Sequence, residues 1–195
     1  MNKGKLIIFS APSGCGKGTM LAEILKCGNY RCSISATTRQ PRENEKNGVN
    51  YYFITREEFE QKINENAFLE YAQYCDNYYG TLISEVDDYL EKGIDVILEI
   101  EVQGALKVME KRPDAVSVFI APPSIKELRR RLKKRGTETK DVIEKRIAEA
   151  TGEIAQIKKY NYIIVNDVLE NAVSDFFAVM RAEKLKSEFS DDIIE

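Results

Sequence analysis

The segment Lys5–Thr19 (KLIIFSAPSGCGKGT) combines the residue types that a phosphate-binding turn needs. A short apolar run that favours a strand, Lys5–Ser10, is followed by a turn that contains Gly14 and Gly16, and a helical pattern starts at Lys17. The glycines would let the backbone come close to an anion, and the free amides at the start of the helix would point at it. The lysine would add a point charge for the outer phosphates. We therefore expect this turn to bind a phosphorylated ligand.

The turn departs from the strict P-loop pattern G-x-x-x-x-G-K-[ST] at both ends. Ala11 stands in place of the first glycine, Gly18 stands where a hydroxyl residue normally follows the lysine, and Thr19 comes one position later. The alternative is a tight strand-to-helix connection without a ligand, but the order of strand, turn, lysine and helix favours phosphate binding. The expected phosphate-binding residues are Ala11, Pro12, Ser13, Gly14, Cys15, Gly16, Lys17, Gly18 and Thr19.

The composition of this 195-residue chain is typical of a single domain with a substantial core, because 43% of its residues are hydrophobic. With 29 basic and 32 acidic residues, there is no net basic field to attract nucleic acid. No apolar stretch approaches the roughly 20 residues that span a bilayer, and the first apolar run is too short for a signal peptide. We expect a cytoplasmic protein with no nucleic acid or membrane partner, while monomer and homodimer both stay open.

The chain contains no histidine, which excludes histidine-based catalytic triads and histidine metal sites. Its four cysteines, Cys15, Cys27, Cys32 and Cys75, lack C-x-x-C spacing and are expected to be free thiols. Cys15 differs from the other three in position, since a thiol at a helix N-terminus can have a lowered pKa and be reactive. Catalysis must therefore use Lys, Arg, carboxylates, hydroxyls and backbone amides.

Short apolar strands alternate with helical segments, which predicts an α/β fold with a parallel sheet flanked by helices. Core strands are expected at Lys5–Ser10, Tyr30–Ala36, Ile94–Ile100, Ala115–Ala121 and Tyr162–Val165. Helices are expected at Lys17–Cys27, Ser84–Lys92 with Ser84 as its cap, Val102–Glu110, from a capping box at Ser124 to about Lys134, Thr139–Tyr160 and Val168–Ser187.

The stretch Thr37–Leu82 has a different character, richer in aromatics and turns, and is expected to be an inserted subdomain. It should contain a strand at Tyr51–Ile54, a helix that starts with a capping box at Thr55, and strands within Ala67–Thr81 around a turn at Asp76-Asn77.

Two clusters in the inserted stretch have the chemistry to recognise a nucleotide. Arg39 and Arg42, with hydroxyl residues on both sides, could hold a phosphate by forked hydrogen bonds, although a solvated charged loop is the alternative. Glu70 is followed by the phenols and hydroxyl of Asn77–Thr81, where the alternative is a strand pair with a surface glutamate.

Two further clusters lie in the rest of the chain. Glu99 and Glu101 end a core strand, where ligands of open α/β sheets bind, and they suit Mg²⁺ or a polar ligand unless they only cap a helix. The basic run Arg129–Thr139 is interrupted by Gly136, which favours a mobile lid that bears arginines over a merely solvated helix face.

Together these segments resemble the guanylate kinases, a family of P-loop nucleoside monophosphate kinases. The resemblance covers nearly the whole chain and is carried by APSGCGKGT, SATTRQPR, NYYF, FLEYAQY, NYYGT, LEIEVQGA, FIAPPS, RRRLKKRGTET and IVND. It implies Mg²⁺-dependent transfer of the ATP γ-phosphoryl group to GMP, with dGMP as a second acceptor. It also implies a core of residues 1–34, 83–125 and 160–195, a GMP-binding region of about 35–82, and a lid of about 126–159.

The resemblance also implies roles for individual residues. Ser35, Glu70, Thr81 and Glu101 would surround guanine, and Arg39, Arg42, Tyr51 and Tyr79 would hold the GMP phosphate. Lys17, Arg131, Arg135 and Arg146 would act on the ATP phosphates, Asn166 would lie near adenine, and the catalytic set would be Lys17, Arg39, Arg135 and Arg146. Mg²⁺ would be held mainly by the phosphates, with Thr19 or Glu99 reached through water. The sequence departs from the family at Glu101, often an aspartate, and at Gly18, a serine in many relatives.

Residue chemistry independently favours guanine, because its N1–H and exocyclic amine are paired donors that one carboxylate such as Glu70 can accept. Adenine would turn a lone pair toward the same carboxylate. Two other functions stay open: a guanylate-kinase-like binding module without catalysis, and a P-loop kinase for a different acceptor.

Overall fold

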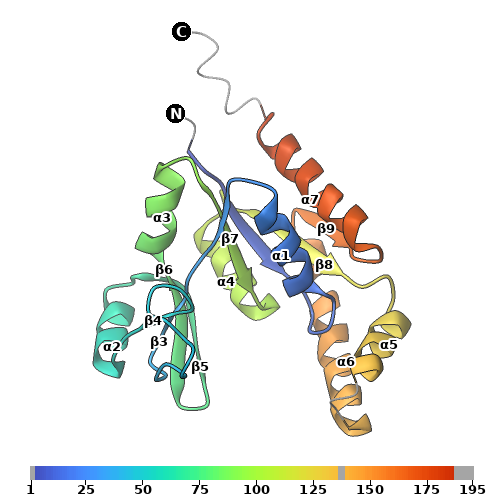
Figure 1. Cartoon of the computed structure of the whole chain (residues 1–195), viewed down its shortest axis with the longest axis horizontal. Helices are drawn as coiled ribbons and strands as arrows, with labels where there is room; N and C mark the ends of the chain where they lie inside the picture. Colours follow the sequence, from blue (N-terminus) through green and yellow to red (C-terminus); the bar gives the residue numbers. More distant parts are fainter. Residues whose placement is uncertain (1–2, 136–138, 187–195) are drawn as a thin grey trace.

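The computed structural model describes residues 3–135 and 139–186. Its centre is a five-stranded parallel sheet in the order β2-β7-β1-β8-β9 (Figure 1). The strands are β1 (Leu6–Ser10), β2 (Tyr30–Cys32), β7 (Asp95–Ile100), β8 (Val116–Ala121) and β9 (Tyr162–Val165). The predicted parallel α/β fold is confirmed, although β2 is shorter than Tyr30–Ala36 because the chain leaves this sheet after Cys32.

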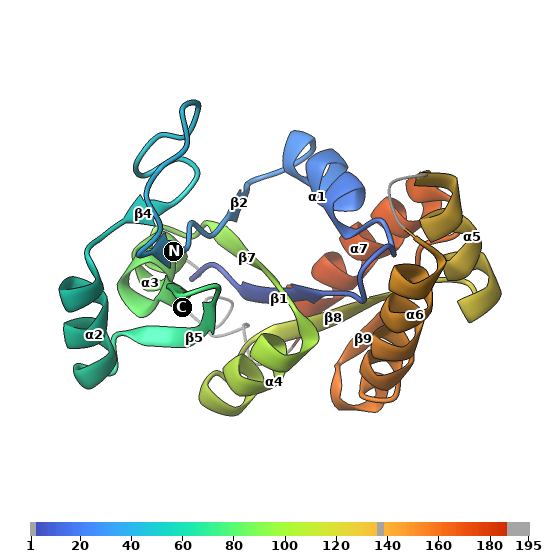
Figure 2. The same ribbon diagram turned by 90° about the horizontal axis from the view of Figure 1, so that it is seen from below.

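Helices cover both faces of the sheet and enclose two hydrophobic cores, because successive side chains of each strand point to opposite faces. Ile7 and Phe9 share a core with α1 (Lys17–Lys26) and α7 (Leu169–Glu183). Leu6 and Ile8 share the other core with α3 (Ile83–Glu91) and α4 (Val102–Lys111). Figure 2 shows α1 and α4 on opposite faces of β1. This packing fixes the end of β1, where the phosphate-binding turn begins.

A second sheet forms a separate lobe beside the first (Figure 1). Its order is β4-β3-β6-β5, with β3 and β4 parallel and the other pairs antiparallel. The elements are β3 (Ala36–Thr37), β4 (Tyr52–Phe53), α2 (Arg56–Asn64), β5 (Phe68–Tyr74) and β6 (Asn77–Leu82). Phe59 of α2 stacks on Phe68 of β5 with ring centroids 4.3 Å apart, so the helix covers the sheet.

The remaining helices, α5 (Ile125–Arg135) and α6 (Lys140–Ile154), pack together as a pair. They lie on the side of the core sheet away from the second sheet (Figure 1). The stretch Thr139–Tyr160, predicted to be largely helical, consists of α6, which ends at Ile154, and a short 3-10 turn, η1 (Ile157–Lys159). The predicted break at Gly136 and the tail Ser187–Glu195 lie outside the described residues. No helix in the described ranges has the length and apolar character to cross a bilayer.

The capping predictions have mixed outcomes. Thr55 forms the predicted capping box with Glu58. The prediction that Ser84 caps α3 is wrong, because β6 runs directly into the helix and Leu82 takes the N-cap position without a side-chain cap. Ser124 accepts the Glu127 N–H at 3.1 Å, but the Glu127 carboxylate binds arginines of its own helix.

Two boundaries in the predictions are also corrected. The hairpin turn between β5 and β6 lies at Cys75 and Asp76, one residue before the predicted turn, and both residues have positive φ angles of 46° and 63°. Helix α7 ends at Glu183 rather than Ser187.

Candidate functional site

The loop between β1 and α1 is shaped by two glycines. Gly14 and Gly16 have φ angles of 92° and 83°, in the left-handed region that other residues rarely adopt. Gly16 takes the N-cap position of α1, and its carbonyl accepts the Met20 N–H at 3.1 Å. The amides of the first helical turn therefore remain free for an anion.

This loop lines a cavity of about 880 Å³. The beginning of α4 and one face of α6 provide the other walls. Of the predicted phosphate-binding residues, the cavity is lined by Ala11, Pro12, Ser13, Gly14, Gly16, Lys17, Gly18 and Thr19.

Lys17 extends from the first turn of α1 to the end of β7. Its Nζ donates to the Ile100 carbonyl at 3.2 Å and lies 3.9 Å from a carboxylate oxygen of Glu99. The side chain is only 18% exposed. The fold therefore holds a positive charge at the carboxyl edge of the sheet, where ligands of open α/β sheets bind.

Cys15 is the one predicted loop residue that does not line the cavity. Its side chain is fully buried, and burial raises the pKa of the thiol to about 12. The expectation of a lowered pKa is therefore wrong, because the loss of hydration outweighs the effect of the helix N-terminus.

We expect Cys15 to resist alkylation. At about pH 8 its thiol stays protonated and covered, whereas the exposed Cys27 and Cys75 should react readily with iodoacetamide. Mass spectrometry of the digested protein at several time points would measure the three rates. Labelling of Cys15 as fast as that of Cys27 would contradict the buried placement.

The arginines predicted for the ATP side take different positions. Arg146 of α6 lines the cavity and donates through Nη2 to Ser13 Oγ, so it lies over the loop. Arg131 of α5 binds Glu127 through Nε at 2.9 Å and the Asn166 carbonyl through Nη1 at 2.9 Å. Arg135 ends α5, but its side chain lies outside the described residues.

Asn166, predicted near adenine, lies beneath the loop and is only 6% exposed. Its Nδ2 donates to the Cys15 carbonyl at 2.8 Å. A Cβ at Gly16 would lie 2.7 Å from the same nitrogen, so glycine is also needed there for space.

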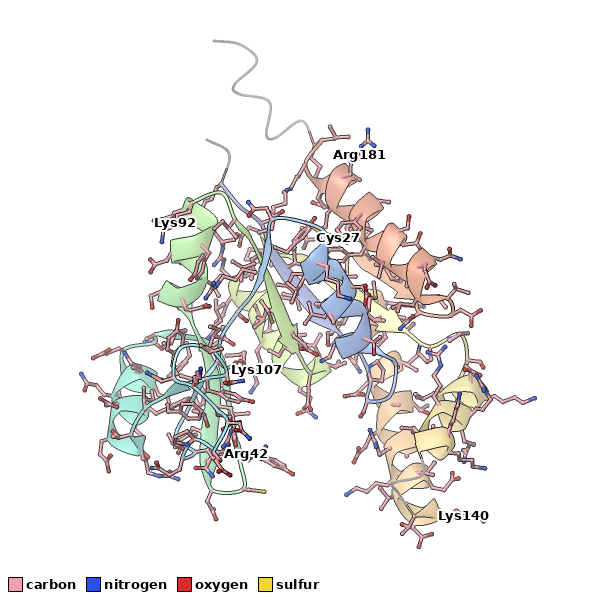
Figure 3. The ribbon with its side chains drawn as sticks, viewed as in Figure 1. Cys27, Arg42, Lys92, Lys107, Lys140 and Arg181 are labelled. Carbon is pink, nitrogen blue, oxygen red and sulfur yellow. The ribbon has the colours of Figure 1, made fainter. Side chains whose placement is uncertain are left out.

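The residues predicted to hold the GMP phosphate gather at the second sheet. The guanidinium of Arg39 lies 5.5 Å from the ring centroid of Tyr51, and that ring lies 6.0 Å from the ring of Tyr79. Arg42 is exposed on the same lobe, on the side of the core sheet opposite Lys140, the first residue of α6 (Figure 3). The structure therefore brings Arg39, Tyr51 and Tyr79 together, with Arg42 on the adjoining loop.

Glu45 also belongs to this group, although sequence reasoning did not select it. One carboxylate oxygen lies 2.8 Å from Arg39 Nη2, and the other accepts the Arg42 N–H at 2.8 Å. The Arg39 guanidinium lowers the pKa of Glu45, so the carboxylate stays ionised. The loop therefore presents hydrogen-bond donors for an anion, and these donors already bind the Glu45 carboxylate. The only signal in the sequence was a carboxylate close to two arginines.

Glu70 and Thr81, predicted for guanine, face each other across β5 and β6. Thr81 Oγ1 donates to Glu70 Oε1 at 3.2 Å. Burial raises the pKa of Glu70, although the Thr81 hydrogen bonds oppose this. A Cβ on Gly104 of α4 would lie 3.6 Å from Glu70 Oε2, so the carboxylate is next to the beginning of α4.

The other two residues predicted for guanine border different cavities. Glu101 occupies the N-cap position of α4 but makes no capping hydrogen bond, and it lines the first cavity. Capping therefore does not explain this carboxylate. Ser35 lines a second cavity of about 700 Å³ together with Tyr51 and Glu99. Since Glu99 is also 3.9 Å from Lys17 of the first cavity, the two cavities meet at this pair.

Oxygen ligands suitable for Mg²⁺ are present near this junction. Thr19 lines the first cavity and Glu99 the second. Within residues 3–135 and 139–186, no group of three or more His, Cys, Asp or Glu side chains is arranged to hold a metal ion. The Thr19 hydroxyl and the Glu99 carboxylate are oxygen groups of the kind that Mg²⁺ prefers.

Comparison with known proteins identifies relatives of the whole chain. Residues 3–183 match the family model described as guanylate kinase. A guanylate kinase of Clostridium tetani is 50% identical over 194 residues, which cover 100% of this chain and 93% of that protein. A guanylate kinase of Latilactobacillus sakei is 49% identical over 187 residues, which cover 95% of this chain and 92% of that protein. A crystal structure of guanylate kinase from Anaplasma phagocytophilum matches with a TM-score of 0.71 and 36% identity over 95% of this chain and 89% of that one.

Proposed function

Because this chain belongs to the guanylate kinase family, we propose that its first cavity holds the phosphates of ATP and its second cavity holds GMP. It is an enzyme of that family, a kinase that phosphorylates a nucleoside monophosphate. One observation carries the proposed arrangement: Lys17 of the phosphate-binding loop lies 3.9 Å from Glu99, which lines the second cavity. The two ligands would therefore meet end to end beside one fixed positive charge.

On the donor side, the loop from Ala11 to Thr19 would bind the ATP phosphates through its free main-chain N–H groups, together with Lys17. Arg146 supports this role, because it lies over the loop and lines the same cavity. Arg135 is proposed as a further cation, and Arg131 would act from α5. Cations in these positions stabilise charge on a transferring phosphoryl group.

On the acceptor side, the second sheet would bind GMP through two groups of residues. Arg39, Arg42, Tyr51 and Tyr79 would hold its phosphate by charge-assisted and phenolic hydrogen bonds. The Glu70 carboxylate would accept the paired donors of guanine, and hydroxyls would donate to its acceptor atoms. The remaining guanine contacts are proposed for Ser35, Thr81 and Glu101, of which Ser35 lines the second cavity and Glu101 lines the first.

Mg²⁺ is proposed as the cofactor. When bound, it would supply positive charge that offsets part of the negative charge of the phosphates. Thr19 and Glu99 are the side chains proposed to reach it through water.

The chemistry proposed for the chain's own residues needs no strong base, because the GMP phosphate oxygen is already an anionic nucleophile. Transfer through a loose, in-line transition state depends mainly on positioning and electrostatics. Lys17, Arg39, Arg135 and Arg146 are the proposed catalytic set. Residues about 126–159 are proposed as a lid that excludes water from the transfer, and residues about 35–82 as the GMP-binding region.

All four cysteines are free, which supports a reducing compartment, and we propose the cytoplasm.

The identity of the acceptor is tested by thermal unfolding with GMP, dGMP, AMP, CMP and UMP. A ligand at about 100 times its Kd adds roughly 2.7 kcal/mol of stability, so GMP should raise the unfolding midpoint clearly and dGMP should do so too. AMP, CMP and UMP should have little effect at the same concentration. Equal shifts with AMP and GMP would reject guanine recognition by the second sheet.

A further inference from the structure

Asn166 lies at a junction of three structural elements. Its main-chain N–H donates to the Ala121 carbonyl at 2.9 Å, which continues the pairing of β8 with β9. Its main-chain carbonyl accepts from Arg131 Nη1 at 2.9 Å, and Arg131 is held in turn by Glu127. Its side chain turns the other way, to the phosphate-binding loop. One residue therefore joins the edge of the sheet, helix α5 and the loop.

The side-chain bond is placed where it controls the conformation of the loop. Asn166 Nδ2 donates to the Cys15 carbonyl at 2.8 Å, between the two residues with positive φ, Gly14 and Gly16. The peptide that joins Cys15 to Gly16 is planar and trans, so a Cys15 carbonyl held by Asn166 turns the Gly16 N–H of the same peptide to the opposite side, and Gly16 lines the first cavity. The same nitrogen packs against Gly16, which is the N-cap of α1. The bond therefore acts on the peptide that starts the helix.

We propose that Asn166 is a positioning residue for phosphate binding: it holds the Cys15–Gly16 peptide so that the loop amides face the ATP phosphates. It acts through the loop rather than on adenine, because the residue is only 6% exposed and its carboxamide donates to a main-chain carbonyl. This inference rests on the proposed assignment of the loop to the ATP phosphates.

The test uses a ligand that has phosphates but no base. Inorganic tripolyphosphate with Mg²⁺ should compete with ATP in the wild-type enzyme and leave GMP binding unchanged. In Asn166→Ala, its inhibition constant should rise about tenfold, the usual effect of one lost hydrogen bond to a buried group. The KM for ATP should rise by the same factor, and the Kd for GMP should not change.

A second variant separates the hydrogen bond from the filled volume. Asn166→Leu keeps a branched side chain of similar size but has no donor, while both main-chain bonds of residue 166 persist. Weak tripolyphosphate binding in both variants supports the inference, and restored binding in Asn166→Leu overturns it. If neither variant folds, as judged by cooperative thermal unfolding, the role is structural and the inference is also overturned.

Asn161 provides the matched control on the same pair of strands. Its Oδ1 accepts from the Ser117 N–H and hydroxyl, both at 2.8 Å, far along β8 from the loop. Asn161→Ala should lower thermal stability without changing the inhibition constant of tripolyphosphate.

Two other outcomes identify which premise fails. If Asn166→Ala weakens ATP but not tripolyphosphate, the side chain serves adenine and the inference is wrong. If the wild-type enzyme does not bind tripolyphosphate in competition with ATP, the assignment of the loop itself is wrong, and the inference fails with it.

Discussion

Replacing Lys17 with alanine is expected to lower kcat by about 10²–10³-fold, the usual cost of removing one group that stabilises transition-state charge. The loss is expected because Lys17 supplies the fixed positive charge at the junction of the two cavities. Folding should be little affected, since Nζ makes one hydrogen bond to Ile100 and a 3.9 Å contact with Glu99. Steady-state kinetics with saturating nucleotides would measure the first effect, and thermal unfolding the second.

Lys26 is the matched control, because it belongs to the same helix and its Nζ pairs with the neighbouring Glu23 at 2.7 Å, where both side chains are exposed. Lys26→Ala should leave kcat unchanged. Near-normal turnover in Lys17→Ala, with an intact fold, would remove the lysine from the mechanism.

Replacing Glu70 with alanine should lower kcat/KM for GMP on the order of 10³-fold, since a site built on hydrogen bonds loses most of its selectivity when they are missing. The KM for ATP should stay close to its wild-type value, because Glu70 belongs to the second sheet. Discrimination between GMP and AMP should fall sharply. Kinetics with both acceptors at a fixed ATP concentration would show these changes.

Glu60 serves as the control for this experiment, since it is an exposed glutamate of the same lobe that lies 3.6 Å from Arg56. Glu60→Ala should leave the selectivity intact. If Glu70→Ala discriminates between GMP and AMP as well as the wild type does, guanine is recognised elsewhere.

Acidification offers a second way to probe Glu70. Burial raises the pKa of this carboxyl, so it gains a proton at a higher pH than an ordinary glutamate. Since only the ionised form accepts both guanine donors, wild-type affinity for GMP should fall as the pH drops through that higher range. Glu70→Gln, which cannot titrate, should lack this part of the pH dependence.

The parallel core could be predicted because its strands are continuous apolar runs and its helices have clear periodicity. Lys5–Ser10 followed by two glycines and Lys17 fixes a strand, a turn and a helix from local residues alone. The structure places the predicted residues of this turn around one cavity, apart from Cys15.

The errors at Cys15 and Ser84 share a physical cause, since each depends on contacts between distant parts of the chain. The rule for thiols at helix N-termini gave the wrong direction for Cys15, because its burial in one core with residues of α5 and β9 cannot be read from its neighbours in sequence. Leu82 replaces Ser84 as the cap because its strand pairs with Phe68. The pairing of Glu45 with Arg39 lies in an irregular loop, where no periodicity predicts which charges meet.

The central claim is that ATP and GMP bind end to end and that the phosphoryl group passes directly between them. The most direct test is to analyse the products that the purified protein forms with Mg²⁺, ATP and GMP. Ion-exchange chromatography should show GDP and ADP accumulating in equal amounts, with almost no ADP when GMP is left out. ADP without GDP would mean that water, not a nucleotide, accepts the phosphoryl group, and the absence of both products would refute the phosphoryl transfer itself.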